Sequence, residues 1–523
     1  MKRPLEVIVV GSGLAGMAYA TQLVDLIGER LVRIRVLAKT SVRQSNSYLA
    51  QGGIAAVMRS DDSIDRHVRD TLEVGEGRND IDVVRLVVSG GPALINGLLR
   101  IGADLDVDVD GRLDLAREGG HSMARVVHHR DRTGEELIRV LQQRMRSTSA
   151  VEVFEQQRAI DLLVEEHDGA RRCIGVRSMD MRRGHLVDRT ADLVVLATGG
   201  AGQVFRHTTN PLGATGDGMA MARRADVPLR DMAFVQFHPT ALYMEGPGPA
   251  FLVSEAVRGA GARLMGRDGT PLMKGIHPLG DLAPRNIVAR AIHREMVDHD
   301  MPHVWLDASP IGTVQFARAF PGIEKECRKR GIVPGRDLIP VMPAAHYMCG
   351  GIRTDDRGLT DLAGLLALGE CASSGLHGAD RLASNSLLEA LVMAKRAAES
   401  TAVYGHRLAL PGEHVVSFDR LSERAGPEVV KFTEVLRRAM FTCMGIIRHH
   451  ESMLHALRII SRFERTVERS WARKRWSREL IDLRDLLSVA RCISEAALAE
   501  PFSIGTHFTS TKEAEAIDSV LAK

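Results

Sequence analysis

The chain has 523 residues, 45% of them apolar and only 4% aromatic, and a formal net charge of +3 with a pI near 8.5. This length exceeds what one hydrophobic core usually serves, so we expect two or three domains. The scarcity of aromatic residues and the interspersed charges argue against a nucleic-acid partner. Six scattered cysteines without a CxxC pair exclude a disulfide framework or a zinc-site spacing, so no metal is expected.

The same cysteine usage fits a reducing cytoplasm. No uninterrupted apolar run reaches the roughly 18 residues that span a membrane, so no membrane partner is expected. The apolar run Val7–Val10 is short and meets a glycine turn at once, which favours a strand over a signal peptide.

Residues 5–200 alternate short β-branched runs with helical patterns, which predicts a parallel α/β sheet. The expected first strand, Val7–Val10, leads into the run Gly11-Ser12-Gly13-Leu14-Ala15-Gly16 and then a helix over 16–26. Gly11 allows a sharp turn, Gly13 lets the backbone approach a pyrophosphate, and Gly16 lets the helix pack on the strand. This setting favours a dinucleotide site over an ordinary βα turn.

The expected second strand, Ile34–Leu37, is followed by Lys39 and carries no acid for ribose hydroxyls. That absence weakens an NAD interpretation more than an FAD one. Small residues and glycines that can lie against a flat ring follow in the run Asn46-Ser47-Tyr48-Leu49-Ala50-Gln51-Gly52-Gly53. Further glycine-bearing segments lie at 197–200, 215–218 and 368–370, and several such segments suit a long FAD.

Later segments divide the chain further. Thr133-Gly134-Glu135-Glu136 has the spacing of a capping box that opens a helix. Residues near 232–347 lose the strand–helix alternation, Leu365–Leu368 predicts a return to the sheet, and the pattern is helical from Pro427. We therefore predict an FAD-binding, Rossmann-like α/β domain over 1–231 and 348–410, an inserted α+β capping domain over 232–347, and a C-terminal helical bundle over 420–523.

These segments, with those at 236–240, 283–285, 343–347 and 377–387, resemble the fumarate reductase/succinate dehydrogenase flavoprotein superfamily from about Val7 to Ser400. Within it the chain is most similar to the branch that oxidises L-aspartate. The resemblance implies FAD contacts at Ser12–Ala15, Lys39, Asn46–Gly53, Ala159, Ile160, Asp217, Glu370, Asn385, Ser386 and Leu387. It also implies a non-covalent flavin, because Asn46 stands where membrane succinate dehydrogenases carry a histidine.

A dicarboxylate needs two sets of cationic or hydrogen-bonding groups, because burying an unpaired anion is very costly. Arg381 and His346 can hold one carboxylate, and His238 and Arg285, with Ser254, the other. Any one of them alone is more often structural, but they occur together within matching motifs. By resemblance Arg285 is the proton-transfer residue, a role that needs a special environment because an arginine is a poor base.

Glu118, in Arg117-Glu118-Gly119-Gly120-His121, separates two chemistries. By resemblance, succinate dehydrogenases carry glutamine there and the aspartate-oxidising branch carries glutamate. Its carboxylate can pair with a substrate ammonium; the alternative is a surface carboxylate in a glycine turn. The expected reaction is hydride transfer from L-aspartate to FAD, giving iminoaspartate, with oxygen (forming peroxide) or fumarate as final acceptor.

The resemblance places this reaction first in de novo NAD synthesis, with quinolinate synthase as a possible partner. Two alternatives stay open: a soluble fumarate reductase or succinate dehydrogenase-type flavoprotein, and a flavin-binding scaffold whose partner supplies the function. Two departures from the family are expected to matter locally. Asp380 stands where the family often has Asn, and the tail run Phe502–His507 lacks the family's Glu and Arg.

Overall fold

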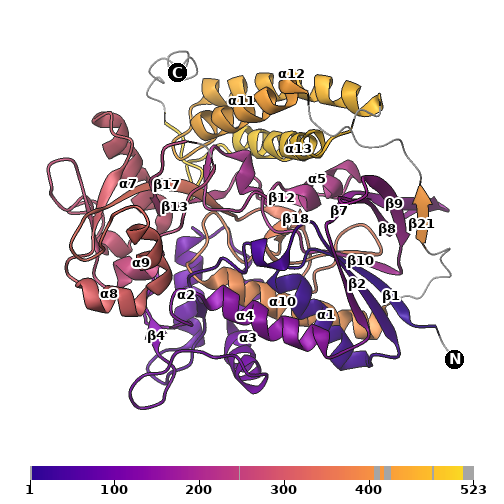
Figure 1. Ribbon diagram of the computed structural model, residues 1–523, viewed down its shortest axis with the longest axis horizontal. Coiled ribbons are helices and arrows are strands. Elements are labelled where there is room, and N and C mark those ends of the chain that lie inside the picture. Colours follow the sequence, from indigo (N-terminus) through magenta and orange to yellow (C-terminus); the bar gives the residue numbers. More distant parts are fainter. Residues whose placement is uncertain (1–2, 247, 406–412, 417–425, 474–475, 511–523) are drawn as a thin grey trace.

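A five-stranded parallel sheet forms the centre of the fold, in the order β19-β10-β1-β2-β6 (Figure 1). The structure is a computed structural model that describes residues 3–246, 248–405, 413–416, 426–473 and 476–510. The strands are β1 (Leu5–Val10), β2 (Val32–Ala38), β6 (Val151–Glu155), β10 (Leu193–Leu196) and β19 (Leu365–Ala367). The predicted α/β fold is confirmed: β1, β2, β10 and β19 are largely buried because helices and a second sheet cover the two faces, whereas the edge strand β6 is half-exposed.

Helices cover one face of this sheet, drawn below it in Figure 1. They are α1 (Leu14–Ile27), α2 (Ile64–Val74), α3 (Ile81–Arg100), α4 (Thr133–Arg146) and α10 (Asn385–Tyr404). Among the described helices, only α3 is long and apolar enough by composition to cross a membrane. It packs on α2 and α10 and buries Val84, Val87 and Ile95 there, so this is a weak indication.

The start of α4 differs from the predicted capping box. Thr133 is the first helical residue, and the preceding residue, Arg132, caps the helix with no side-chain hydrogen bond. The Thr133 hydroxyl instead accepts a hydrogen bond from the backbone N–H of His129 (3.0 Å). The Thr133 hydroxyl oxygen therefore accepts from a loop N–H and does not cap the helix as the spacing predicted.

The other face of the central sheet carries an antiparallel sheet in the order β21-β9-β8-β7. Its strands are β7 (Gln157–His167), β8 (Ala170–Asp180), β9 (His185–Thr190) and β21 (Glu413–Val416). Helix α5 (Asp217–Arg224) contacts β7. Short strands form two small sheets: β3 (Ile54–Ala55), β4 (Leu115–Ala116) and β5 (Val126–Val127), and β12 (Leu229–Arg230), β18 (Gly351–Arg353) and β20 (Ala372–Ser373).

A third unit lies at one side of the molecule and has its own apolar cluster. Its sheet contains β11 (His207–Thr208), β13 (Val235–Leu242), β14 (Gly248–Pro249), β15 (Arg263–Met265), β16 (Val304–Asp307) and β17 (Ile339–Met348). Its helices are α6 (Glu255–Gly259), α7 (Arg285–Asp298), α8 (Thr313–Ala319) and α9 (Pro321–Arg328). The division into three domains stays a prediction, and its limits at 410 and 420 fall outside the described residues.

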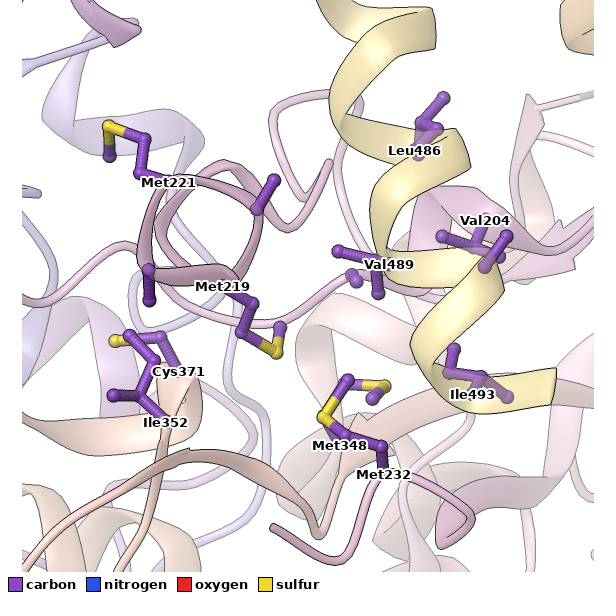
Figure 2. Packing of buried hydrophobic residues seen from close by; sticks show 14 of the residues in the cluster. Val204, Met219, Met221, Met232, Met348, Ile352, Cys371, Leu486, Val489 and Ile493 are labelled. Carbon is purple, nitrogen blue, oxygen red and sulfur yellow. The ribbon is translucent and has the colours of Figure 1, made fainter. Parts of the chain in front are cut away.

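Three C-terminal helices lie along the top of Figure 1: α11 (Pro427–Cys443), α12 (His450–Ala472) and α13 (Arg478–Ala499). They do not form a separate core. Figure 2 shows Val489 and Ile493 of α13 in the same apolar cluster as Val204, Met219 and Met348. The apolar stripe predicted along α13 is therefore buried against α5 of the predicted FAD-binding domain as well as against α11 and α12.

Candidate active site

The glycine turn after β1 is closely packed. Gly11 has φ +115°, and a Cβ there would lie 2.1 Å from the carbonyl oxygen of Ala197; a Cβ at Gly16 would lie 2.3 Å from that of Gly11. The N–H of Leu14, the first residue of α1, donates to Ser47 Oγ (3.1 Å). The turn is thus held against the end of β10 and the segment 46–53, with backbone exposed where a helix N-terminus favours phosphate.

One pocket extends from this turn to the predicted substrate residues. Its walls include most of the predicted cofactor residues: Gly11, Ser12, Gly13, Leu14, Ala15, Lys39, Asn46, Ser47, Leu49, Ala50, Gln51, Gly52, Gly53, Ala159, Asp217, Glu370, Ser386 and Leu387. All six predicted substrate residues, Glu118, His238, Ser254, Arg285, His346 and Arg381, also line it. Segments far apart in sequence therefore meet in one elongated cavity.

Four predicted cofactor residues lie outside the pocket wall. Gly16 packs behind the glycine turn, and Ile160 is buried in a cluster with Met179 and Ile481. Tyr48 donates its hydroxyl to Glu135 (2.8 Å), and Asn385 bonds His67 and Thr71. The Tyr48, Ile160 and Asn385 side chains therefore support the wall from behind, because neighbouring backbone and helices hold them there.

The residues at the two ends of the cavity fit a bound FAD. At one end Lys39 Nζ lies 2.5 Å from Thr215 Oγ1, 3.6 Å from Asp217 and 3.5 Å from Asp482. Gly369, which also lines the pocket, has φ +66°, and a Cβ there would lie only 3.0 Å from the Cβ of Ala15. The buried Gln51 Oε1 has no hydrogen-bond partner within the described residues. An elongated ligand with polar edges would satisfy that oxygen, as a flavin does.

Two arginines face the substrate end and share one acceptor. Arg285 Nη1 and Arg381 Nη2 each donate to Gln236 Oε1 at 3.0 Å. Arg381 also donates to Ser386 Oγ (2.8 Å) and lies 4.4 Å from the ring centroid of Tyr347. Burial, together with the nearby Arg285, lowers the pKa of Arg381. Two buried guanidinium groups side by side form a site for carboxylate groups.

A buried ion-pair chain continues behind Arg285. Arg285 Nε donates to Glu255 Oε2 (2.7 Å), and Arg258 Nη2 donates to Glu255 Oε1 (3.0 Å). Burial by itself would raise the pKa of Glu255, but the two arginines hold it below its ordinary value. The Arg285 guanidinium group is thus held by a buried carboxylate and by the Gln236 amide, and its part in proton transfer stays a prediction.

The two histidines of the site are neutral. Burial, and next the charge of Arg285, lowers the pKa of both His238 and His346 well below the ordinary value. His238 Nδ1 accepts from the N–H of Thr240 (3.2 Å), which leaves the proton on Nε2; that atom is buried without a partner among the described residues. His346 Nδ1 bonds Thr209 Oγ1 (2.8 Å). They therefore supply hydrogen-bonding edges rather than charge.

Glu118 is buried, with an exposed fraction of 2%, which excludes the surface-carboxylate alternative. Its Oε2 accepts from Ser384 Oγ (2.6 Å). Burial, and next the charge of Glu255, raises the pKa of Glu118. The loop is held in place because His121 Nε2 bonds the carbonyl of Ala383 (2.9 Å). A second anionic group beside two arginines suits a substrate that carries a cation as well as carboxylates.

Several contributing residues were not predicted from the sequence. Gln236, Glu255 and Ser384 contact predicted site residues directly, and Arg258 acts through Glu255. The spacing of Glu255 and Arg258, three apart in a helical pattern, signals a local pair. Ser254 caps α6, where its Oγ accepts from Ala256 N (3.3 Å), so its hydroxyl serves the helix as well as the pocket.

Fold and site together define an FAD-dependent flavoprotein oxidoreductase that binds small dicarboxylates. Residues 6–387 match the family model described as FAD binding domain. An L-aspartate oxidase from Ralstonia nicotianae is 41% identical, covering 96% of this chain and 95% of the relative. A chloroplastic L-aspartate oxidase from Arabidopsis thaliana is 38% identical, covering 96% of this chain and 80% of the relative.

Among solved structures, a mutant FrdA chain of E. coli quinol fumarate reductase superposes with a TM-score of 0.86 at 30% identity, covering 99% of this chain and 94% of that chain. The superfamily resemblance is thus confirmed. The chain belongs to the L-aspartate oxidase family.

Proposed function

We propose that this protein catalyses the FAD-dependent oxidation of L-aspartate to iminoaspartate. The observation that carries the proposal is the buried carboxylate of Glu118 in the same pocket as Arg285 and Arg381. Two arginines match two carboxylates, and Glu118 matches an ammonium group. Succinate has the two carboxylates but no cation, so it would leave Glu118 unpaired and buried.

The residues of this pocket bind and orient the substrate. Arg381 with His346, and Arg285 with His238, hold the two carboxylates, and Glu118 holds the α-amino group. Loss of hydride from the α-carbon requires a neutral amine, and Glu118, whose pKa is raised by burial, can accept the ammonium proton. FAD, when bound, supplies the two-electron acceptor. Oxygen, which is reduced to peroxide, or fumarate then takes up the two electrons and two protons.

Further properties follow from the proposal. No histidine stands at Asn46, whose side chain donates to Glu370 Oε2 (3.1 Å), and this supports a non-covalent flavin. The enzyme would supply the first intermediate of de novo NAD synthesis, in the cytoplasm, with quinolinate synthase as the partner that takes the unstable imine.

A soluble fumarate reductase or succinate dehydrogenase-type flavoprotein is the second candidate. The specific observation in its favour is the superposition on fumarate reductase at a TM-score of 0.86. A buried anion at Glu118 weakens it, because a plain diacid offers no cation to compensate that charge. The third candidate, a flavin-binding scaffold, is weakened because His238, Arg285, His346 and Arg381 all line one pocket.

Substrate profiling of the wild type and of Glu118→Gln tests the proposal. The purified holoprotein should form peroxide and oxaloacetate, the hydrolysis product of the imine, from L-aspartate in air. Glu118→Gln should lower kcat/KM for L-aspartate at least about tenfold, since it removes a charged pair, and should spare fumarate reduction. Glu73→Gln, at an exposed position of α2, is the matched control.

No turnover of L-aspartate by wild-type protein with FAD bound would refute the proposed reaction. Unchanged aspartate kinetics in Glu118→Gln would refute the ammonium-binding role alone. Dye-linked activity with succinate that exceeds activity with aspartate would favour the fumarate reductase or succinate dehydrogenase alternative.

A further inference from the structure

Asp380 is a completely buried carboxylate directly before the substrate-binding Arg381. Its Oδ1 accepts from Gln236 Nε2 (2.6 Å) and from the backbone N–H of Arg381 (2.9 Å), and its Oδ2 accepts from the N–H of Asn286 (3.3 Å). Within the described part of the chain it forms no ion pair with a lysine or arginine. Its charge is therefore compensated by these amide donors and by the nearby charge of Arg285, an arrangement that is costly unless each donor is kept in place.

The contact with Gln236 decides which way that amide faces. A glutamine amide has one accepting oxygen and one donating nitrogen. Gln236 Nε2 donates to Asp380 and to the carbonyl of Arg381 (2.8 Å), so Oε1 must point to the other side. There it accepts from Arg285 and Arg381 together, each at 3.0 Å. A reversed amide would present N–H groups to both guanidinium groups and would push them apart.

The contact with Asn286 holds the helix that carries Arg285. Helix α7 begins at Arg285, its preceding residue Pro284 has no capping side chain, and the first backbone N–H groups of a helix lack intrahelical partners. The Asp380 carboxylate lies at this N-terminus, where the helix dipole favours negative charge. Asp380 thus joins the start of α7, the backbone of Arg381 and the amide between the two arginines.

The C-terminal tail supports this loop from behind. Thr506 donates its N–H and its hydroxyl to the carbonyl of Ala379, both at 3.0 Å. A Cβ at Gly505 would lie 2.4 Å from the same oxygen, and Arg290 of α7 donates to the carbonyl of Gly505 (2.9 Å). The run Phe502–His507, although it lacks the family's Glu and Arg, therefore packs directly on the residue before Asp380.

We propose that Asp380 is a positioning residue for dicarboxylate binding: it fixes the Gln236 amide so that Arg285 and Arg381 face the substrate as a pair. The inference rests on the dicarboxylate site of the proposed function but not on aspartate oxidation itself. It acts through Gln236, so its effect should depend on that residue, whereas a purely structural cap of α7 would act regardless of Gln236.

A double-mutant cycle on the holoprotein tests this dependence, with the dissociation constant of succinate measured from the change in flavin absorbance. Asp380→Leu should raise that constant about tenfold or more, because it removes the acceptor that orients Gln236. Asp380→Asn keeps one oxygen for Gln236 and should raise it about threefold. In a Gln236→Leu background either change should add less than about twofold.

Asp131→Leu is the matched control. Asp131 is also buried and accepts from the N–H groups of Gly322 and Ile323 at the start of α9, away from the pocket. Its substitution should lower the thermal midpoint and leave succinate binding unchanged. The inference would be overturned if the Asp380 variants had a lower thermal midpoint but bound succinate as tightly as the wild type. It would also be overturned if they weakened succinate binding equally with Gln236 and with Leu at position 236.

If Asp380→Leu fails to retain FAD, Asp380→Asn in the two Gln236 backgrounds decides the question by the same criterion. The proposed reaction is tested separately. If substitution of Asp380 weakens succinate binding as expected but the wild-type protein does not oxidise aspartate, the reaction is refuted and the positioning role stands.

Discussion

Gly119 shows how closely the backbone of the Glu118 loop approaches the buried charges. A Cβ at this position would lie 2.1 Å from Glu255 Oε1. Glu255 bonds both Arg258 and Arg285, so displacing it moves the guanidinium group that faces the substrate. The glycine pair beside Glu118 therefore serves a close approach between two acidic residues, which only a residue without a side chain permits.

We predict that Gly119→Ala lowers kcat/KM for L-aspartate at least about tenfold, because small displacements of positioning groups are costly in catalysis. FAD binding and the far-ultraviolet circular dichroism spectrum should stay as in the wild type. Gly97→Ala in α3, where a Cβ would meet only Arg100 at 3.9 Å, should keep full activity. Wild-type kcat/KM in Gly119→Ala would contradict the argument.

At the scale of elements, α13 is attached to the flavin-binding part by buried charges as well as by apolar contacts. Asp485 is 1% exposed and accepts from Arg158 (2.9 Å) and Arg224 (2.8 Å), which come from β7 and α5. Asp482, one turn earlier, pairs with Arg158 and lies 3.5 Å from Lys39 Nζ. The last helix therefore contacts a residue that lines the cofactor pocket.

We predict that Asp485→Ala lowers the free energy of unfolding by about 2–3 kcal/mol, because it removes one hydrogen-bonded carboxylate from both Arg158 and Arg224, which keep Asp482 and Asp161 as their other partners. Urea unfolding followed by circular dichroism and by release of FAD measures this loss. Glu468→Ala, which removes the 55% exposed partner of Arg484, should cost less than about 1 kcal/mol. Similar losses in the two variants would show that the buried network does not anchor α13.

Across the whole molecule, histidines with a lowered pKa connect stability to pH. Burial, and next the charge of nearby Arg206, lowers the pKa of His207 to about 4, whereas an unfolded histidine titrates near about 6.5. Between these values the unfolded chain binds more protons than the folded one. The contribution of neutral His207 to the free energy of unfolding is therefore complete above about pH 6.5 and is lost as the pH falls towards 4.

We predict that His207→Phe reduces the loss of unfolding free energy between pH 7 and pH 5 by about 1–2 kcal/mol relative to the wild type. The ring lies 4.9 Å from that of Phe441, an aromatic environment that accepts phenylalanine. Denaturant titrations at the two pH values measure the difference. His167→Phe, at a 94% exposed side chain, should follow the wild type, and an identical pH dependence in both variants would refute the assignment to His207.

Much of the fold and site is predictable from the sequence because its signals are local. The run at 7–26 predicts a buried strand, a tight glycine turn and a helix. The short apolar runs that form β10 and β19 likewise predict buried parallel strands. Glu118, Arg285 and Arg381 are candidate substrate residues because they lie in motifs that resemble the superfamily. The structure brings them into one pocket, and their contacts with a substrate stay a prediction.

Only the tertiary structure decides the rest, because it depends on segments that meet from distant parts of the chain. The orientation of Gln236 follows from contacts with α7 and with residues 380–381. The neutrality of His238 and His346 follows from burial beside Arg285. Periodicity predicts the C-terminal helical bundle, and the three helices do pack on one another. Only the structure shows that they also belong to the main apolar cluster, because a periodic stripe indicates which face of a helix is buried but not what covers it.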